Sequence, residues 1–218
     1  MDPIYNEKYT EYQTTRGIIR AWIRSLYMRK AASLAVGPTL DFGCGIGDLL
    51  CGLPDGSCGL ECNPHTVEHA RLRGLDVTLY DGYSDEWQLS ALPLDKKFNT
   101  FVISHVLEHF ENPFDVFNKL IKAAEKRSVK RLVIIVPGLA GFKIDSSHRR
   151  FIEPADFRKF FNSLPDWKIE SMHYYPFNFK KASELFPHNE LQLVANKKWK
   201  STACSRRTSN LGAAGAVN

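Results

Sequence analysis

Residues 40–50 read LDFGCGIGDLL, a short apolar stretch that contains an acid and runs into glycines at alternate positions. Glycine lets the backbone bend sharply and approach a ligand closely, because it has no Cβ. A strand that leads into such a turn, with a helix after it whose first N–H groups are free, is typical of nucleotide sites. The segment therefore predicts an α/β fold with a nucleotide site at the end of its first strand.

The spacing of the glycines narrows the kind of nucleotide. A dinucleotide-binding turn reads GxGxxG. This turn reads GxGxG, and Asp41 stands two residues before the first glycine, Gly43. A carboxylate at that position suits a cationic ligand group better than a pyrophosphate.

Outward from the turn, strands and helices alternate. Strands are predicted at 39–42, 58–61, 77–80, 100–104 and 132–136, and helices at 64–73, 113–124 and 154–162. Two later segments, 167–175 and 189–196, look like edge strands, and one or two amphipathic helices are predicted within residues 5–34. Such alternation implies right-handed crossovers. The expected fold is a doubly wound, mostly parallel, seven-stranded Rossmann-like sheet with helices on both faces.

This pattern divides the chain into three predicted segments. Residues 1–36 are expected to form an N-terminal helical lid, residues 37–197 the Rossmann-like domain, and residues 198–218 a flexible basic tail. The tyrosines of the first segment (Tyr5, Tyr9 and Tyr12) suit either the packing face of a helix or a contact with the cofactor.

Two further acids end predicted strands. Glu61 ends the second strand, about twenty residues after Asp41, where a carboxylate can accept both hydroxyls of a ribose. Asp81 and Gly82 follow the third strand, where a short acid can accept from an adenine amino group. Open α/β sheets bind ligands at this carboxyl edge, so the acids and the glycine turn belong to one predicted site.

The series DFGCGIGDLL, GLECNPHTVEHAR, VTLYDG, FNTFVISHVLEHFENP and RLVIIVPG, within residues 40–138, resembles the motifs of class I S-adenosylmethionine-dependent methyltransferases. The resemblance implies S-adenosylmethionine as cofactor and S-adenosylhomocysteine as product. It also implies roles for the motif residues. Asp41, Gly43 and Gly45 would surround the methionine part. Glu61 would hold the ribose with Cys62 beside it, Asp81 and Gly82 would border the adenine, and Ser104 with His105 would line the cofactor.

Methyl transfer is an in-line displacement, for which the protein aligns the nucleophile and excludes water. A hydroxyl nucleophile also needs a base. The candidates are His105, Glu108 and His109 after the fourth strand, and His148 in the polar loop after the fifth strand. Each histidine also has a structural interpretation, as a packing residue or a loop hydrogen bond.

The acceptor is expected to be a small-molecule hydroxyl or a phosphate-bearing group. The chain has no NPPY-like tetrapeptide after the fourth strand, no Pro-Cys pair and no added basic domain, so nucleic acid is not favoured. The nearest resemblance is to methyltransferases of bacterial surface-polysaccharide synthesis, and Arg149 and Arg150 suit an anionic or nucleotide-linked acceptor. Two alternatives stay open: methylation of a quinone or other metabolite beside the aromatic residues 174–186, and a non-catalytic cofactor-binding regulatory protein.

Composition sets the remaining expectations. The 218 residues carry a formal net charge of +5 and contain no apolar run long enough to span a bilayer. The first fifteen residues lack the pattern of a secretory signal, and the five cysteines form no CxxC pair, so reduced thiols and a cytoplasmic location are expected. No metal-binding residues are predicted, because no carboxylate cluster exists beyond the cofactor acids, and metal dependence stays open. A zinc site from Cys58, Cys62, His65 and His69 is allowed by spacing alone. No feature decides the oligomeric state.

Overall fold

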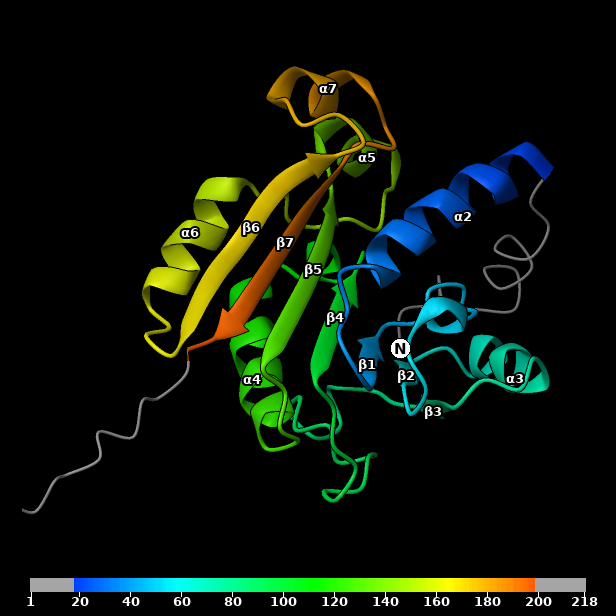
Figure 1. The fold of residues 1–218 in the computed structure, drawn as a ribbon. Helices are drawn as coiled ribbons and strands as arrows, with labels where there is room; N and C mark the ends of the chain where they lie inside the picture. The colour runs from blue at the N-terminus through cyan, green and yellow to red at the C-terminus, as the bar shows by residue number, and fades with distance from the viewer. Residues whose placement is uncertain (1–17, 199–218) are drawn as a thin grey trace, which may run out of the picture.

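The computed structural model describes residues 18–198. Within them one sheet has the strand order β3-β2-β1-β4-β5-β7-β6 (Figure 1). Its strands are β1 (Thr39–Phe42), β2 (Cys58–Glu61), β3 (Val77–Leu79), β4 (Thr100–Ser104), β5 (Arg131–Pro137), β6 (Trp167–Tyr175) and β7 (Glu190–Lys197). Neighbours among β1 to β5 pair in parallel, and β7 is antiparallel to both β5 and β6. The predicted seven-stranded, mostly parallel sheet is confirmed.

One prediction about the sheet was wrong. Residues 189–196 were expected at an edge, but β7 lies between β5 and β6, and the edge strands are β6 and β3. The polar side chains of Glu190 and Gln192 alternate with apolar ones and so imitate a solvent-facing side. Both are buried, and Gln192 Nε2 donates to Glu190 Oε1 at 2.8 Å. Because these two side chains bond to each other, an interior strand can carry the alternating polar pattern of an edge strand.

The helices are α2 (Ile18–Ala32), α3 (Pro64–Leu72), α4 (Pro113–Glu125), α5 (Leu139–Ile144), α6 (Pro154–Asn162) and α7 (Lys180–Leu185). The predicted α3, α4 and α6 are confirmed to within a residue, because each begins at a proline after a capping residue. Asn63 caps α3 by accepting from His65 N–H at 3.0 Å. The helices α5 and α7 were not predicted, since six residues carry too little periodicity.

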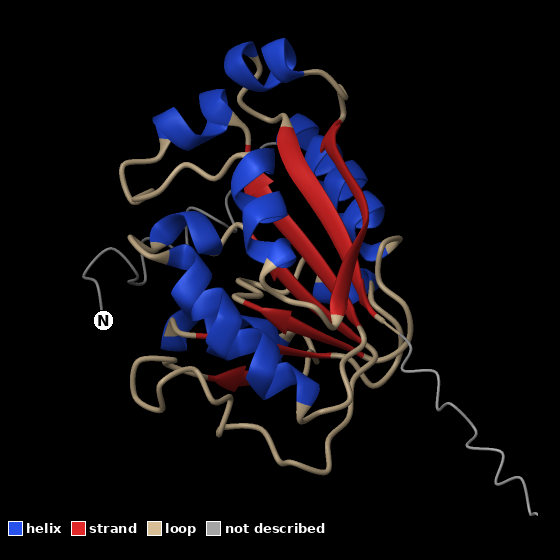
Figure 2. Cartoon of the chain, turned by 90° about the vertical axis from the view of Figure 1, so that its left-hand side faces the viewer, coloured by secondary structure: helices blue, strands red, loops and turns tan. Residues whose placement is uncertain are grey.

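Helices cover both faces of the twisted sheet (Figure 2). Along β4, Phe101 and Ile103 face the cluster that contains the apolar side of α4 and α6. Val102 between them faces the cluster that contains Ala31 of α2. This strict alternation follows from the two-residue period of a strand and explains why the central strands are apolar on both faces.

The segment after the glycine turn differs from the prediction of a helix. Only a single turn of 3-10 helix, η1 (Leu50–Gly52), follows the turn among the described residues before β2. Glycines at 45, 47 and 52 and a proline at 54 leave too few residues for an α-helix to form. The turn is therefore not followed by the α-helix N-terminus that the sequence predicted as a source of free N–H groups.

Helix α2 leads toward the glycine turn. Its end packs on the sheet through Ala31, and Arg24 Nε donates to Asp48 Oδ2 at 2.7 Å. Tyr27 meets the ring of Tyr175 edge-on at 5.3 Å. The helix thus links the segment after the glycine turn to β6. The predictions for Tyr5, Tyr9, Tyr12 and the tail lie outside the described residues.

No helix within residues 18–198 has the length and apolar character that crossing a bilayer requires.

Candidate active site

The glycine turn folds back against β2. The N–H groups of Gly43 and Cys44 donate to Leu60 O at 2.8 and 3.1 Å. Gly43 has φ +73°, in the left-handed region that favours glycine. A Cβ on Gly43 would also lie 2.4 Å from Val106 Cγ2. Glycine is therefore required at this position for two reasons, the left-handed backbone and the close approach of Val106.

Glu61 lies at the centre of the predicted cofactor site. Its side chain is buried, its Oε2 accepts from Gly45 N–H at 2.9 Å, and its Oε1 accepts from Asn63 N–H at 2.9 Å. The carboxylate therefore joins the glycine turn to the start of α3. Each oxygen still has a free lone pair, so this arrangement is suited to hold two neighbouring hydroxyls as well.

Asp41 presents a second acid on the adjacent strand. It is 1% exposed, and its Oδ2 has no hydrogen-bond partner within residues 18–198. Burial, with a further contribution from the charge of Glu61, raises the pKa of Asp41 to about 7. A buried carboxylate without a cation is costly in free energy. The site is therefore complementary to a positively charged ligand group.

We expect the affinity for S-adenosylmethionine to rise with pH between 6 and 8. A bound cation favours the ionised form of Asp41, so below a free pKa of about 7 binding must expel a proton and affinity falls by up to about tenfold per pH unit. The other titratable groups coupled to Asp41 are Glu61 and the thiols of Cys44 and Cys58. Calorimetric titration of wild type and Asp41→Asn checks this expectation. The variant should bind more weakly and lose most of the pH dependence; an equal slope in both proteins would contradict the assignment.

The residues predicted at the adenine end are placed beside β3. Asp81 Oδ1 accepts from Tyr83 N–H at 3.1 Å. A Cβ on Gly82 would lie 2.0 Å from the ring of Trp87, so glycine is needed here to admit that ring. Trp87 is buried and contacts Tyr83 and Phe110 edge-on, with ring centroids at 4.9 and 5.1 Å. Sequence reasoning missed Trp87, because it lies in an irregular loop.

Cys62 and Ser104 complete the predicted cofactor residues. Burial and the neighbouring Glu61 raise the pKa of the Cys62 thiol to about 12, so it stays neutral and is no nucleophile. Ser104 is the last residue of β4. The Cys58, Cys62, His65 and His69 spacing produces no metal-binding group in the described part of the chain.

His105 lies between two carboxylates. Its Nδ1 is 3.3 Å from Glu108 Oε1 and its Nε2 is 3.1 Å from Glu190 Oε2. Desolvation disfavours the charged ring, but the two carboxylates outweigh it and raise the pKa of His105 to about 10. A protonated imidazole donates hydrogen bonds and cannot take up a proton, so the geometry favours a binding or positioning role over that of a general base. The role of Glu190 was missed, because β7 was expected at an edge.

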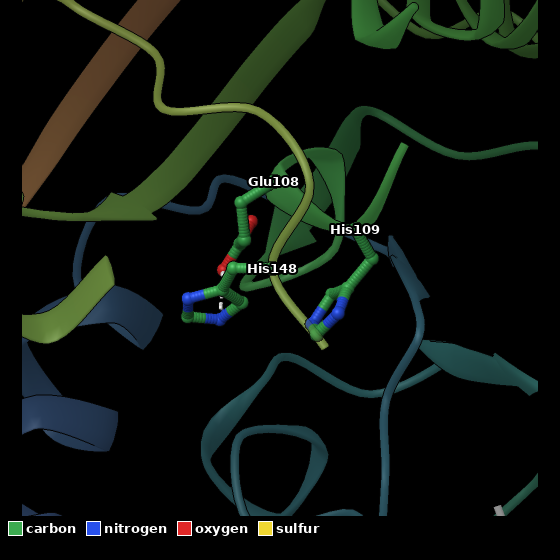
Figure 3. A group of neighbouring side chains, drawn as sticks. All are labelled: Glu108, His109 and His148. Carbon is green, nitrogen blue, oxygen red and sulfur yellow. Dashed lines mark ion pairs between the residues drawn. The ribbon is translucent and has the colours of Figure 1, made fainter. Parts of the chain in front are cut away.

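Three other candidates, Glu108, His109 and His148, come together beside it (Figure 3). His148 Nδ1 lies 2.9 Å from Phe142 O. A carbonyl only accepts, so Nδ1 carries the proton and Nε2 is left as the free nitrogen. That Nε2 lies 3.9 Å from Glu108 Oε1. The rings of His109 and His148 pack with centroids 4.9 Å apart.

Backbone hydrogen bonds join the two segments that carry this group. The N–H groups of Arg149 and Arg150 donate to Glu108 O at 2.8 and 3.1 Å. The 3-10 helix η2 (Leu107–His109) and the loop after α5 are thereby held together. Burial lowers the pKa of the His109 imidazole below its usual value. The structure thus places the three histidines predicted as catalytic in one region.

The sequence matches no protein-family model. No match was found among curated proteins either. Solved structures do match. An S-adenosylmethionine-dependent methyltransferase from Archaeoglobus fulgidus has a TM-score of 0.60 and 20% identity, covering 88% of this chain and all 100% of the other. Magnesium protoporphyrin IX methyltransferase from Synechocystis, with bound SAH, has a TM-score of 0.61 and 16% identity over 89% and 97% of the two chains. A small RNA methyltransferase has a TM-score of 0.57 and 16% identity over 82% of this chain and 25% of its own.

These similarities define the class of fold. The sheet has antiparallel β7 inserted between β5 and β6. The solved structures that resemble this chain include several S-adenosylmethionine-dependent methyltransferases. The chain therefore has the class I S-adenosylmethionine-dependent methyltransferase fold.

Proposed function

We propose that this protein is an S-adenosylmethionine-dependent methyltransferase that methylates a hydroxyl of a small molecule. The observation that carries the proposal is the pair of buried acids at the glycine turn. Glu61 joins Gly45 to Asn63 through its two oxygens, and Asp41 keeps a buried oxygen without a hydrogen-bond partner. Fold similarity alone supplies no site, whereas these acids fit the two polar ends of this cofactor.

The acids suit different parts of the cofactor. Glu61 would accept from the ribose hydroxyls, and Asp41 would face the positively charged methionine part, close to Gly43 and Gly45. S-adenosylmethionine, when bound, supplies a methyl group on a sulfonium, which needs no further activation of the leaving group. The protein then has to align the acceptor oxygen with that methyl and exclude water.

The group of Glu108, His109 and His148 is suited to the acceptor side. It follows β4 and β5 at the carboxyl edge of the sheet, next to the glycine turn, since Val106 contacts Gly43. His148 Nε2 lies 3.9 Å from Glu108 Oε1 and 3.8 Å from Asp145 Oδ2. These residues would orient the acceptor hydroxyl and ease the loss of its proton.

We expect His148→Asn to lower kcat by about 10²–10⁴-fold, the range for loss of a group that assists proton transfer. S-adenosylmethionine binding should stay within about twofold of wild type, because His148 is not part of the cofactor site. His173→Asn, on the edge strand β6, is the matched control and should leave both quantities unchanged. A fall in kcat of less than about fivefold in His148→Asn would remove this residue from the chemistry.

The class of acceptor is inferred from the exposed residues that follow His148. Arg149 and Arg150 are exposed beside His148 and suit a phosphate-bearing acceptor, such as a nucleotide-linked sugar used in surface-polysaccharide synthesis. A second candidate, an apolar metabolite such as a quinol, is favoured by the exposed rings of Phe177 and Phe179, which pack 6.2 Å apart.

Transfer of labelled methyl from S-adenosylmethionine tests the proposal. Nucleotide-linked sugars, quinols and a short RNA are offered in parallel to the full chain. Label in the sugar supports the first candidate, label in the quinol supports the second, and label in RNA alone overturns the small-molecule assignment. Cofactor binding without transfer to any class would favour a non-catalytic regulatory protein.

A further inference from the structure

We infer that Glu108, His109 and His148 form a binding site for a divalent transition-metal ion on the acceptor side of the site. The three residues each offer one ligand atom, and these atoms all lie within 4.8 Å of one another. In Figure 3 they converge from η2 and from the loop after α5. The binding of the ion stands on this geometry; its role in catalysis rests on the proposed function.

The spacing of the ligand atoms matches a shared ion. Ligand nitrogens and oxygens at about 2.0–2.2 Å from one metal lie about 3.0–3.5 Å apart when adjacent and about 4.2 Å apart when opposite. His148 Nε2 and Glu108 Oε1 are separated by 3.9 Å. This distance is too long for a hydrogen bond and lies between the spacing of adjacent and of opposite ligands of one metal. Small side-chain rotations would therefore complete the site.

The buried carboxylate of Glu108 has capacity for a further cation. Its side chain is 1% exposed, yet neither carboxylate oxygen has a hydrogen-bond partner among residues 18–198. The ring nitrogens of His105 and His148 that lie nearest to Oε1 are 3.3 and 3.9 Å away. A buried carboxylate with so few partners is destabilising unless a further positive charge compensates it.

Neighbouring groups hydrogen-bond to the two histidines, as groups around metal-bound histidines usually do. His148 Nδ1–H donates to Phe142 O at 2.9 Å, and this hydrogen bond orients the ring with Nε2 toward Glu108. Ser147 Oγ lies 3.2 Å from His109 Nδ1 and donates to Asp145 Oδ1 at 2.6 Å. Metal-bound histidines usually have such a second hydrogen bond, which sets the orientation of the ring.

The ligand types select the kind of metal. Two imidazoles and one carboxylate suit Zn²⁺, Co²⁺, Fe²⁺ or Mn²⁺, whereas Mg²⁺ and Ca²⁺ prefer an all-oxygen set. Three protein ligands leave positions open for an exogenous oxygen. The sequence predicted no metal-binding residues, because that prediction looked for a cluster of acids and not for histidines supplied by two separate loops.

The ion would act on the acceptor hydroxyl. A Lewis acid at this position lowers the pKa of a hydroxyl, so its proton leaves to solvent while the oxygen forms a bond to the methyl carbon. The carbon–sulfur bond of the cofactor breaks, and its electron pair stays on sulfur, giving neutral S-adenosylhomocysteine. The lone pair of His148 Nε2 would then hold the metal, so that His148 would assist the loss of the proton through the ion.

Metal titration of the full chain, first stripped with a chelator, tests the inference. Co²⁺ is followed by its visible absorption, and Zn²⁺ and Mg²⁺ by calorimetry. We expect one Co²⁺ or Zn²⁺ per chain, with Mg²⁺ at least about 100-fold weaker. Glu108→Gln and His148→Asn should each weaken Co²⁺ binding by at least about tenfold and change its spectrum. His173→Asn should bind as wild type does.

The outcomes separate the metal site from the proposed function. Equal Co²⁺ binding in wild type, Glu108→Gln and His148→Asn, or no binding to wild type, would overturn the metal site. Circular dichroism and S-adenosylmethionine binding show that each variant is folded, so loss of metal alone is informative. A chain that binds Co²⁺ through these residues but binds no S-adenosylmethionine would keep the metal site and overturn the proposed function.

Discussion

Replacing Glu61 by alanine is expected to raise the dissociation constant for S-adenosylmethionine about 100-fold, or ~2.7 kcal/mol. Two effects add. The ribose hydroxyls lose a charged acceptor, and the N–H groups of Gly45 and Asn63 lose the carboxylate that orders the turn at 2.9 Å each. Calorimetric titration of the purified chain measures the change.

The matched control for this prediction is Glu68→Ala. Glu68 is exposed on the neighbouring helix α3 and carries the same charge, so its loss should alter the dissociation constant by less than about twofold. Similar affinities for Glu61→Ala and wild type would mean that the cofactor does not bind at this edge of the sheet. A loss in both variants would point to a general charge effect.

Replacing Arg127 by alanine is expected to lower the free energy of unfolding by about 3–5 kcal/mol. Arg127 is 1% exposed, and its guanidinium donates to Leu89 O, Leu92 O and Ala123 O at 2.7, 2.8 and 3.2 Å. Alanine would leave buried carbonyls without donors and open a cavity beneath the loop that carries Trp87. Urea unfolding of the full chain gives the free energy.

Lys126→Ala is the control for Arg127, since the neighbouring Lys126 is exposed and its Nζ donates to the side-chain Oε1 of Gln88 at 3.0 Å. Its effect should stay within about 0.5 kcal/mol. Arg127→Lys should recover only part of the stability, because an ammonium cannot reproduce the planar fork. A loss below about 1 kcal/mol for Arg127→Ala would show that water replaces the guanidinium at these carbonyls.

Local sequence signals account for the sheet and for the cofactor end of the site. Asp41, Gly43 and Glu61 belong to strand ends that are continuous in sequence, and parallel strands bring their carboxyl ends to one edge. Asn63-Pro64 and Asn112-Pro113 mark helix starts for a stereochemical reason. Such features require no knowledge of distant contacts, so the sequence alone predicts them.

Features that depend on distant partners escaped prediction. Glu190 is polar in sequence but buried in β7, where it meets His105 85 residues away. Arg127 looks like part of a solvated basic run, yet carbonyls of a loop 35 and 38 residues earlier bind its guanidinium. The placement of Glu108 beside His148 needs the hydrogen bonds from Arg149 and Arg150 N–H. Burial of a polar group is decided by such pairing, which composition and periodicity do not encode.

The central claim is that the acid-lined glycine turn binds the sulfonium cofactor. Calorimetric titration of the full chain with S-adenosylmethionine, and separately with NAD, tests it most directly. The account predicts saturable binding of one S-adenosylmethionine per chain and no measurable binding of NAD, because Asp41 repels a pyrophosphate. Binding of NAD in preference to S-adenosylmethionine, or of neither, would contradict the claim and leave the fold without its proposed function.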